Sequence, residues 1–471
     1  MPVSLRMSSV ARRRALFFCL IVMVAAGIRL LTYNFQRAHL DDPNWFQSGS
    51  YRVFEKRAND ILDGSGRLYW IDDPSRTDQV QYPPAYPWMV AAIYRISGNR
   101  SAYSVQTVQA VLDSILALVL ITGLAVTAYG WPTGMAASVF AGLSPLLALV
   151  GVAPSADAPT TWFVIAGLWL LVIAAKRGSI LWALASGIML GAACWLRVNP
   201  LYLCLFWALP LFFFAHASRS RRALMGGAVI LGTILMISPI VVRNYVVFPD
   251  FTPTGGTIGA NLWEGLGEAE LGRANGFAVG DDILIEHERV KMGVPAGAPF
   301  EAMWPDGIKR ERERTREALA FIKQHPVWYA GVILRRMWGM LKVAGEPLPY
   351  YGTSGINVTS RKCLSPARQG GLLALLVNGL GMLQSVTRYA LLPLALVGCG
   401  FAVRANWPPT SLFFATIFYY LVPGTLAHTE IRYVLTLHWI LPIFAGLAVV
   451  TLLNFIRRGR WPHTRPVGDK L

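Results

Sequence analysis

The sequence has little charge and little cysteine for its length. Only 15% of its 471 residues are charged, whereas 54% are hydrophobic, and the mean hydropathy is positive. A soluble globular protein would struggle to keep such a balance in solution. The five cysteines show no CxxC spacing and no framework of closely spaced pairs, so neither a disulfide scaffold nor a paired-cysteine zinc site is supported. The composition predicts an all-α polytopic membrane protein.

Several motifs of soluble enzymes and pumps are also missing. The chain contains no GxxxxGK[ST], which argues against a nucleotide-driven pump, and no HExxH zinc motif. The glycine-rich stretch GGTIGANLWEGLG, residues 255–267, does not lie between a strand and a helix of a βαβ unit, so it does not support a dinucleotide site. No metal site is predicted from the residues.

Long apolar runs predict the membrane spans. A hydrocarbon layer of about 30 Å needs about 20 mostly apolar residues. The first run is too long for a cleaved signal peptide and lacks a small-residue cleavage site, so we expect it to remain as an anchor. We expect 10–13 spans in total. Ten of them can be given bounds: 15–33, 104–128, 133–153, 159–175, 180–196, 200–215, 223–247, 388–403, 409–427 and 434–456.

The distribution of basic residues predicts the orientation of these spans. With a cytoplasmic N-terminus, the cytoplasmic segments hold 15 of the 43 basic residues and one of the 26 acidic residues. Short cytoplasmic segments accumulate Lys and Arg. We therefore expect both termini on the cytoplasmic side of the plasma membrane and the polar loops on its outer side. The formal charge of +17 is thereby explained without a nucleic-acid partner.

The predicted topology divides the chain into three parts. Residues 1–247 form a transmembrane module with a first outside loop at 34–103. Residues 248–387 form a long outside region with amphipathic helices, and 388–471 form the last spans and a basic tail. The apolar segment 370–384 is ambiguous, since it suits half a hairpin or a re-entrant piece. The motif GIMLG at 187–191 fits close helix packing.

Ionisable residues near span ends are the candidate functional groups. They all fall on the predicted outside face, and ionisable side chains at membrane depth are costly unless they have a role. Their convergence predicts a site for an anionic, lipid-linked substrate. They are Asp41 and Asp42 after the first span, Asp157 in APSADAPT, Arg197, Arg243, and His428, Glu430 and Arg432 in LAHTEIRYVL.

Each of these groups also has a structural interpretation. Asp41 and Asp42 suit solvated loop residues, and Arg197 and Arg243 suit arginines that reach lipid headgroups from span ends. Glu430 and Arg432 suit an interfacial pair that neutralises itself. Asp113, inside the second span, suits a structural pair with a neighbouring helix. Asp157 is more informative, because a carboxylate in a tight turn at the hydrocarbon boundary needs a partner or a role.

The motifs in their order resemble the GT-C superfamily of membrane glycosyltransferases. The resemblance rests on an acidic motif after the first span, PPAYPWMVAAIYRISG, a short acidic outside loop, SPIVVRNYVVFPDFTPTGGTIGANLWEG, and HTEIRYVLTLHWILPIFAGLA near the end. It runs from about residue 15 to 455. The chain looks most similar to the bacterial branch that includes lipid A aminoarabinose transferases and protein O-mannosyltransferases.

The resemblance implies transfer of a sugar from a polyprenyl phosphate to an acceptor hydroxyl on a lipid, glycan or protein, with inversion at the anomeric carbon. It places the catalytic base at Asp42 or Asp41, with Asp42 favoured, and assigns Asp157 to the acceptor or to a cation. It assigns Arg243, then Arg432 and His428, to the lipid phosphate, with Glu430 fixing their orientation and Arg197 also on the donor side. It leaves open whether a divalent cation takes part.

Two other classes fit part of the sequence. A transporter or lipid flippase also has about ten spans with ionisable groups, but such proteins commonly show repeated halves and a site at the midplane, and this chain shows no repeat. An outer-leaflet glycan ligase or polymerase acting on diphosphate-linked donors also uses basic outside loops. Only the resemblance of the RN and HxExRY motifs argues against the second class.

Overall fold

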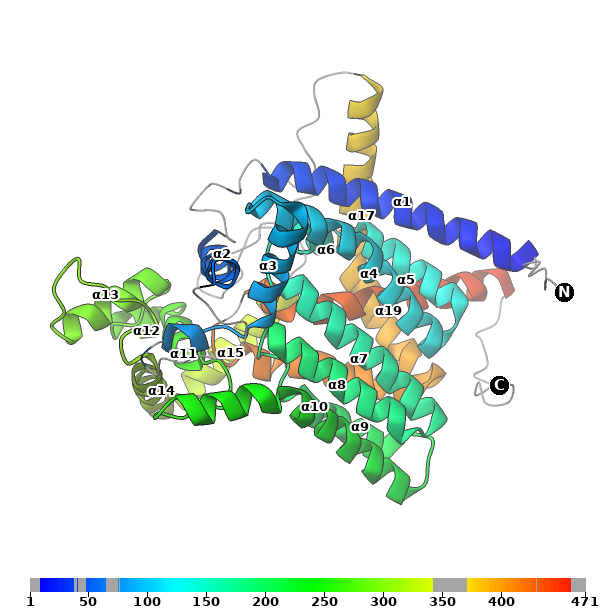
Figure 1. Cartoon of the computed structure of the whole chain (residues 1–471). Helices are drawn as coiled ribbons and strands as arrows, with labels where there is room; N and C mark the ends of the chain where they lie inside the picture. The colour runs from blue at the N-terminus through cyan, green and yellow to red at the C-terminus, as the bar shows by residue number, and fades with distance from the viewer. Residues whose placement is uncertain are drawn as a thin grey trace.

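The computed structural model shows a bundle of long helices with a lobe of shorter helices at one end (Figure 1). It describes residues 9–37, 48–64, 77–341, 371–428 and 430–458, together with residues 40 and 75. In these ranges every element of regular secondary structure is a helix, and Glu301 and Trp304 form an isolated antiparallel β-bridge. The prediction of an all-α chain is confirmed.

The helices fall into three groups. Those of the bundle are α1 (Ser9–Arg37), α4 (Ala102–Tyr129), α5 (Trp131–Leu143), α6 (Pro145–Val152), α7 (Asp157–Arg177), α8 (Ile180–Leu196), α9 (Leu203–Phe214), α10 (Arg219–Val247), α17 (Leu372–Ala405), α18 (Trp407–Leu421) and α19 (Leu435–Arg458). Two shorter helices, α2 (Ser48–Leu62) and α3 (Ala85–Ser97), lie in the first predicted loop. The lobe contains α11 (Ile258–Gly267), α12 (Glu270–Ala274), α13 (Asp281–Lys291), α14 (Gly307–Gln324) and α15 (Pro326–Leu341).

All ten predicted spans are helical, but they differ in length. Among the described residues, six helices are long and apolar enough to cross a membrane. The pair α5 and α6 passes the same test only when taken together, as a broken span or a re-entrant loop, and it bends by 65°. The bend lies where Ser144 caps α6 and Pro145 begins it, because proline is favoured in a first turn and cannot continue a preceding helix. The spans predicted at 180–196, 200–215 and 409–427 are the shorter helices α8, α9 and α18.

The ambiguous segment 370–384 belongs to a long helix. Helix α17 runs without interruption from Leu372 to Ala405, so the segment joins the span predicted at 388–403 instead of forming a hairpin or a re-entrant piece. Its first turns project from the bundle beside α1 (Figure 1), and Val377 packs with Ile28 of α1.

Small residues and a buried ion pair hold the bundle together. A Cβ atom at Gly187 would lie 2.1 Å from the carbonyl oxygen of Val229, so the predicted close packing at GIMLG is confirmed for α8 and α10. Asp113 accepts hydrogen bonds from Arg29 Nε and from Trp162 Nε1, both at 2.9 Å. The predicted structural pairing of Asp113 is therefore confirmed, and it joins α1, α4 and α7.

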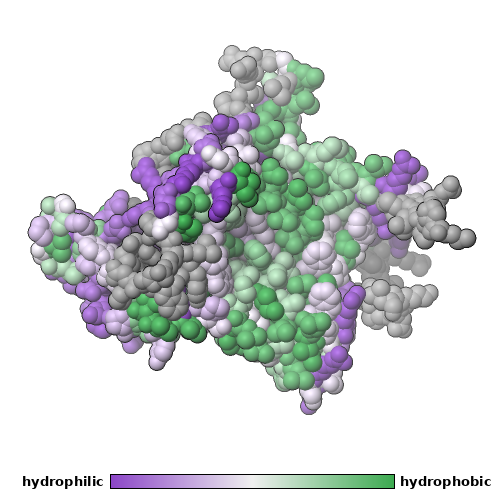
Figure 2. All heavy atoms as spheres, viewed as in Figure 1, coloured by the Kyte–Doolittle hydropathy of each residue, from purple (hydrophilic) through white to green (hydrophobic). Residues whose placement is uncertain are grey.

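The surface has the layered polarity of a membrane protein. Figure 2 shows a broad hydrophobic surface over the bundle, with hydrophilic residues gathered on the lobe and at the opposite end. Helix α1 begins and α19 ends at the end away from the lobe (Figure 1). A helical chain with such a belt and several long apolar helices is a multi-pass membrane protein.

Candidate active site

The turn before α7 places a carboxylate at the lobe end of the bundle. Asp157 occupies the first turn of α7 and is 3% exposed. Its Oδ1 lies 3.0 Å from Nε of Arg197, the residue that follows α8 as its C-cap. An acidic residue is favourable at a helix N-terminus, but a carboxylate this deeply buried also needs a partner. The predicted site residues Asp157 and Arg197 therefore form an ion pair.

The motif HTEIRY forms a second cluster between α18 and α19. His428 Nδ1 lies 2.5 Å from Glu268, and its Nε2 lies 3.5 Å from Glu430. Arg432 donates to Glu430 with Nη2 at 2.6 Å and also pairs with it through Nε. His428 and Arg432 are both buried. Glu430 therefore lies between His428 and Arg432. The interfacial pair predicted for Glu430 and Arg432 is part of a longer chain of alternating charges.

Tyr433 connects the two clusters. The guanidinium carbons of Arg197 and Arg432 each lie 5.4 Å from the centre of its ring, which is within the range of cation–π attraction. Asp157, Arg197, Arg432, Glu430 and His428 therefore form one continuous group drawn from three distant parts of the chain.

Tyr86 of α3 borders the same group. Burial, and then the charge of Asp157, raise the pKa of the Tyr86 hydroxyl well above its usual value. The Tyr86 hydroxyl donates to Gln109 Oε1 at 3.0 Å. Tyr86 is therefore uncharged and borders the cluster on the side of α3.

Two residues of the lobe complete the group, and the motif analysis missed both. Glu268, just after α11, binds His428 and also accepts from Arg336 Nε of α15 at 3.0 Å. Arg336 is fully buried and donates to the carbonyl oxygens of Thr425 and Gly265. A second carboxylate, Glu264, lies one turn earlier on α11. The signal in the sequence was a pair of carboxylates spaced i, i+4 in the short apolar helix NLWEGLGE.

The charges of the group shift the pKa values of its members. Burial alone would lower the pKa of His428, but its hydrogen bonds to Glu268 and Glu430 and their charges raise it to about 10. Burial would raise the pKa of Glu430, but the charge of Arg432 and the contact with His428 lower it to about 2. Burial and the charge of Asp281 raise the pKa of Glu264 to about 8, against the opposing charge of His428. At neutral pH, His428 is therefore an imidazolium and Glu264 a neutral acid.

These shifts predict how stability depends on pH. Because the pKa of His428 is raised above its usual value of 6.5, its contribution is complete below about pH 6.5 and is lost as the pH rises towards 10. Because the pKa of Glu430 is lowered, its contribution is lost only as the pH falls below about 4.5. We expect the thermal unfolding midpoint of the protein in detergent to fall between pH 6.5 and 10.

In the variant His428→Gln, the thermal unfolding midpoint should fall less between pH 6.5 and 10. His216 is exposed at the opposite end of the bundle, so His216→Gln is the matched control and should keep the wild-type profile. Glu264→Gln should make the fall shallower below about pH 8, because the raised pKa of Glu264 makes the folded state hold a proton that the unfolded state has lost. A His428→Gln profile parallel to that of the wild type would contradict the assigned charge of His428.

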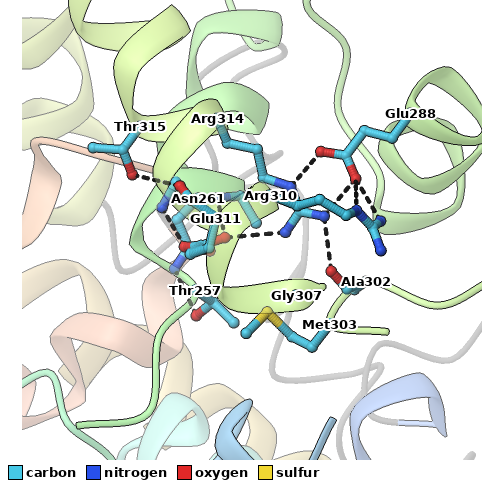
Figure 3. A network of polar contacts seen from close by, with 12 residues as sticks. Thr257, Asn261, Glu288, Ala302, Met303, Gly307, Arg310, Glu311, Arg314 and Thr315 are labelled. Carbon is cyan, nitrogen blue, oxygen red and sulfur yellow. Dashed lines mark hydrogen bonds and ion pairs between the residues drawn. The ribbon is translucent and has the colours of Figure 1, made fainter. Parts of the chain in front are cut away.

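A buried ion-pair network holds α11 in place (Figure 3). Glu311 of α14 accepts hydrogen bonds from the backbone N–H groups of Gly259 and Ala260 in the first turn of α11. Arg314 binds both Glu311 and Glu288 of α13, and Arg310 also binds Glu288. The alternating charges of KRERER therefore include contacts that cap α11 and fix the helix from which Glu264 and Glu268 approach the site.

The other predicted site residues are placed as follows. Arg243, near the end of α10, is buried and donates to Asn244 Oδ1 with Nε at 2.9 Å and Nη2 at 2.7 Å. Asp41 and Asp42 lie outside the described residues. Their membership in the site remains a prediction. Within the ranges that the structure describes, no three His, Cys, Asp or Glu side chains are grouped so as to hold a metal ion.

The fold and the site define a helical membrane protein with a buried ion-pair group at one polar end. Residues 81–242 match the family model described as dolichyl-phosphate-mannose-protein mannosyltransferase. This segment contains Tyr86, Asp157 and Arg197, which form one half of the group. The match covers about a third of the chain, and over that third it agrees with the predicted resemblance to GT-C glycosyltransferases. No curated protein matches the chain.

Two solved structures are similar to this chain to different degrees. The oligosaccharyltransferase of Archaeoglobus fulgidus, tethered with an acceptor peptide, is similar over 94% of this chain and 50% of its own, with 14% identity and a TM-score of 0.50. ArnT from Cupriavidus metallidurans bound to undecaprenyl phosphate covers 93% of this chain and 79% of its own, with 12% identity and a TM-score of 0.36. The chain thus spans about half the length of the archaeal enzyme, and the likeness to that enzyme concerns the fold alone.

Proposed function

We propose that the protein is an inverting glycosyltransferase that moves a sugar from a polyprenyl-phosphate donor to an acceptor hydroxyl. The observation that carries the proposal is the continuous group from Asp157 through Tyr433 to His428, which combines carboxylates and cations at the lobe end of the bundle. In this proposal the lobe end faces outside the plasma membrane, and both termini are cytoplasmic. The match to a dolichyl-phosphate-mannose family and the undecaprenyl phosphate bound by ArnT agree with such a donor.

The reaction needs a base at one side of the anomeric carbon and cations at the other. The acceptor oxygen attacks that carbon while its proton passes to a carboxylate, which we assign to Asp42, or else to Asp41. The bond from the anomeric carbon to the phosphate oxygen breaks, and polyprenyl phosphate leaves with its negative charge. General-base help of this kind is worth about 10²–10⁴ in rate, and direct displacement requires no covalent sugar–enzyme intermediate.

The cations have distinct places in the proposal. Arg432, with Arg197 and Arg243, supports the charge that develops on the leaving phosphate, since a guanidinium can hold two phosphate oxygens. Both nitrogens of His428 face carboxylates, so we assign it to holding Glu430 and, through Glu430, Arg432. Asp157 holds Arg197, and we assign it to orienting the acceptor.

The direct test is a transfer assay with the purified full-length protein. Synthetic polyprenyl phosphates that carry different sugars are supplied with lipid and peptide acceptors, and release of polyprenyl phosphate and formation of the glycosylated acceptor are followed. We expect inversion at the anomeric carbon and dependence on the phosphate. Parallel reactions with Mg²⁺, with Mn²⁺ and with a chelator measure any role of a divalent cation. Movement of the intact donor across vesicles without loss of its sugar would instead identify a lipid flippase.

A further inference from the structure

Helix α15 has two faces of different character. Val327, Leu334 and Trp338 are exposed by 85%, 66% and 66%, respectively. Their spacing of seven and four residues places them on one side of a helix. Tyr329, on another side, is buried, and its hydroxyl donates to the carbonyl oxygen of Leu426. One side of α15 therefore carries large apolar side chains outward, although the helix begins in the polar lobe.

The buried side of α15 holds the polar motif. Arg336 binds Glu268 and the carbonyl oxygen of Thr425, and Glu268 binds His428. Tyr329 and Arg336 thereby fix the turn that leads into the motif. Any element that sets the position of α15 also sets the position of His428 and its neighbours.

The last turn of α15 lies at the depth of the membrane bundle. Met340 is completely buried in the main hydrophobic core, together with residues of α18 and α19. Its carbonyl oxygen lies 2.9 Å from Nε2 of His438, which belongs to the candidate membrane span Ile431–Arg458. At 1.5 Å of rise per residue, Trp338 lies about 3 Å and Leu334 about 9 Å along the axis from Met340. Their exposed side chains therefore lie within two helical turns of a residue that contacts a candidate membrane span.

We propose that the Val327–Leu334–Trp338 face of α15 lies among the lipid chains of the leaflet next to the lobe. The helix is continuous with the apolar core of the bundle through Met340, and a tryptophan at this depth suits the membrane interface. The lipid layer then sets the depth of α15, and its Arg336 side holds the motif at that depth. The proposal rests on the membrane position of the bundle and is independent of the transferase activity.

The first experiment measures the depth of Trp338 in the full-length protein. The wild type and Trp338→Phe are reconstituted into vesicles of phosphatidylcholine with or without bromine on the acyl chains. The difference between their emission spectra is the signal of Trp338. We expect brominated lipids to quench this difference signal and aqueous acrylamide to leave most of it. A difference signal that acrylamide quenches and bromine does not would overturn the proposal.

A second measurement compares matched exposed positions. Val290 on α13 of the lobe is 63% exposed and apolar, close to the 66% of Leu334. Leu334→Cys and Val290→Cys are prepared in a chain whose five native cysteines are replaced by alanine, and each is spin-labelled in vesicles. We expect the label at 334 to collide mainly with dissolved oxygen and that at 290 mainly with a water-soluble nickel chelate. Equal access to the chelate at both positions would overturn the proposal, whether or not the protein transfers sugar.

Discussion

Replacing Arg432 by lysine is expected to slow sugar transfer by about 10²–10³, the loss that follows removal of one group that stabilises developing charge. Lysine keeps the positive charge but lacks the planar fork that binds two oxygens at once. Arg432 is buried and held by Glu430, so its guanidinium is already oriented before the substrate arrives. The measurement is the single-turnover rate of polyprenyl phosphate release at saturating donor.

The matched control for this substitution is Arg312→Lys. Arg312 is an exposed residue of α14 that binds Asp250, and its replacement should leave the rate unchanged. The thermal unfolding midpoint of Arg432→Lys should stay close to that of the wild type, because Glu430 keeps its contact with His428. A wild-type rate for Arg432→Lys, or a loss of rate that only matches a loss of folded protein, would remove Arg432 from the donor side.

Most of the bundle could be predicted because its signal is local. A run of about 20 apolar residues identifies a span without knowledge of its neighbours, and each of the ten predicted runs is helical. What the sequence did not reveal depends on contacts between distant segments. The apolar run 370–384 by itself could not show that it continues into the next span as α17, and Pro145 marks the break between α5 and α6 without giving its angle of 65°.

The candidate site likewise contains residues that could be predicted from the sequence and residues that could not. Asp157, Arg197 and the motif residues were visible because ionisable groups stand out beside apolar runs. Glu268 and Arg336 were missed because they lie inside the long outside region 248–387, away from the predicted span ends, although the spacing of Glu264 and Glu268 in an apolar helix was a signal. Only the fold brings Glu268 within 2.5 Å of His428. The same contact changes the expected role of His428, from a direct ligand of the lipid phosphate to a cation held between two carboxylates.

The variant Asp42→Asn is expected to lower the turnover rate by about 10²–10⁴, because an amide cannot accept the proton of the attacking hydroxyl. Asp41→Asn is the matched control, with the same chemical change one residue away, and should keep most of the activity. If Asp41→Asn is the inactive variant, the base is Asp41 and the rest of the proposed site is unaffected. The rate is followed as a function of pH, since loss of a base also removes the acidic limb of the profile.

Asp157→Asn separates a shared site from a site formed by Asp42 alone. The substitution removes the charge that faces Arg197 at 3.0 Å, and Arg197 also borders the Tyr433 ring, so the change reaches the proposed donor side. Helix α2, which follows Asp42 in the chain, packs in the same hydrophobic cluster as Ala156, the neighbour of Asp157. We therefore expect Asp157→Asn to slow transfer and to weaken donor binding, whereas Asp42→Asn changes turnover alone. Wild-type rates in both variants would show that the reaction uses neither carboxylate, and the lobe carboxylates Glu264 and Glu268 would then become the groups to replace.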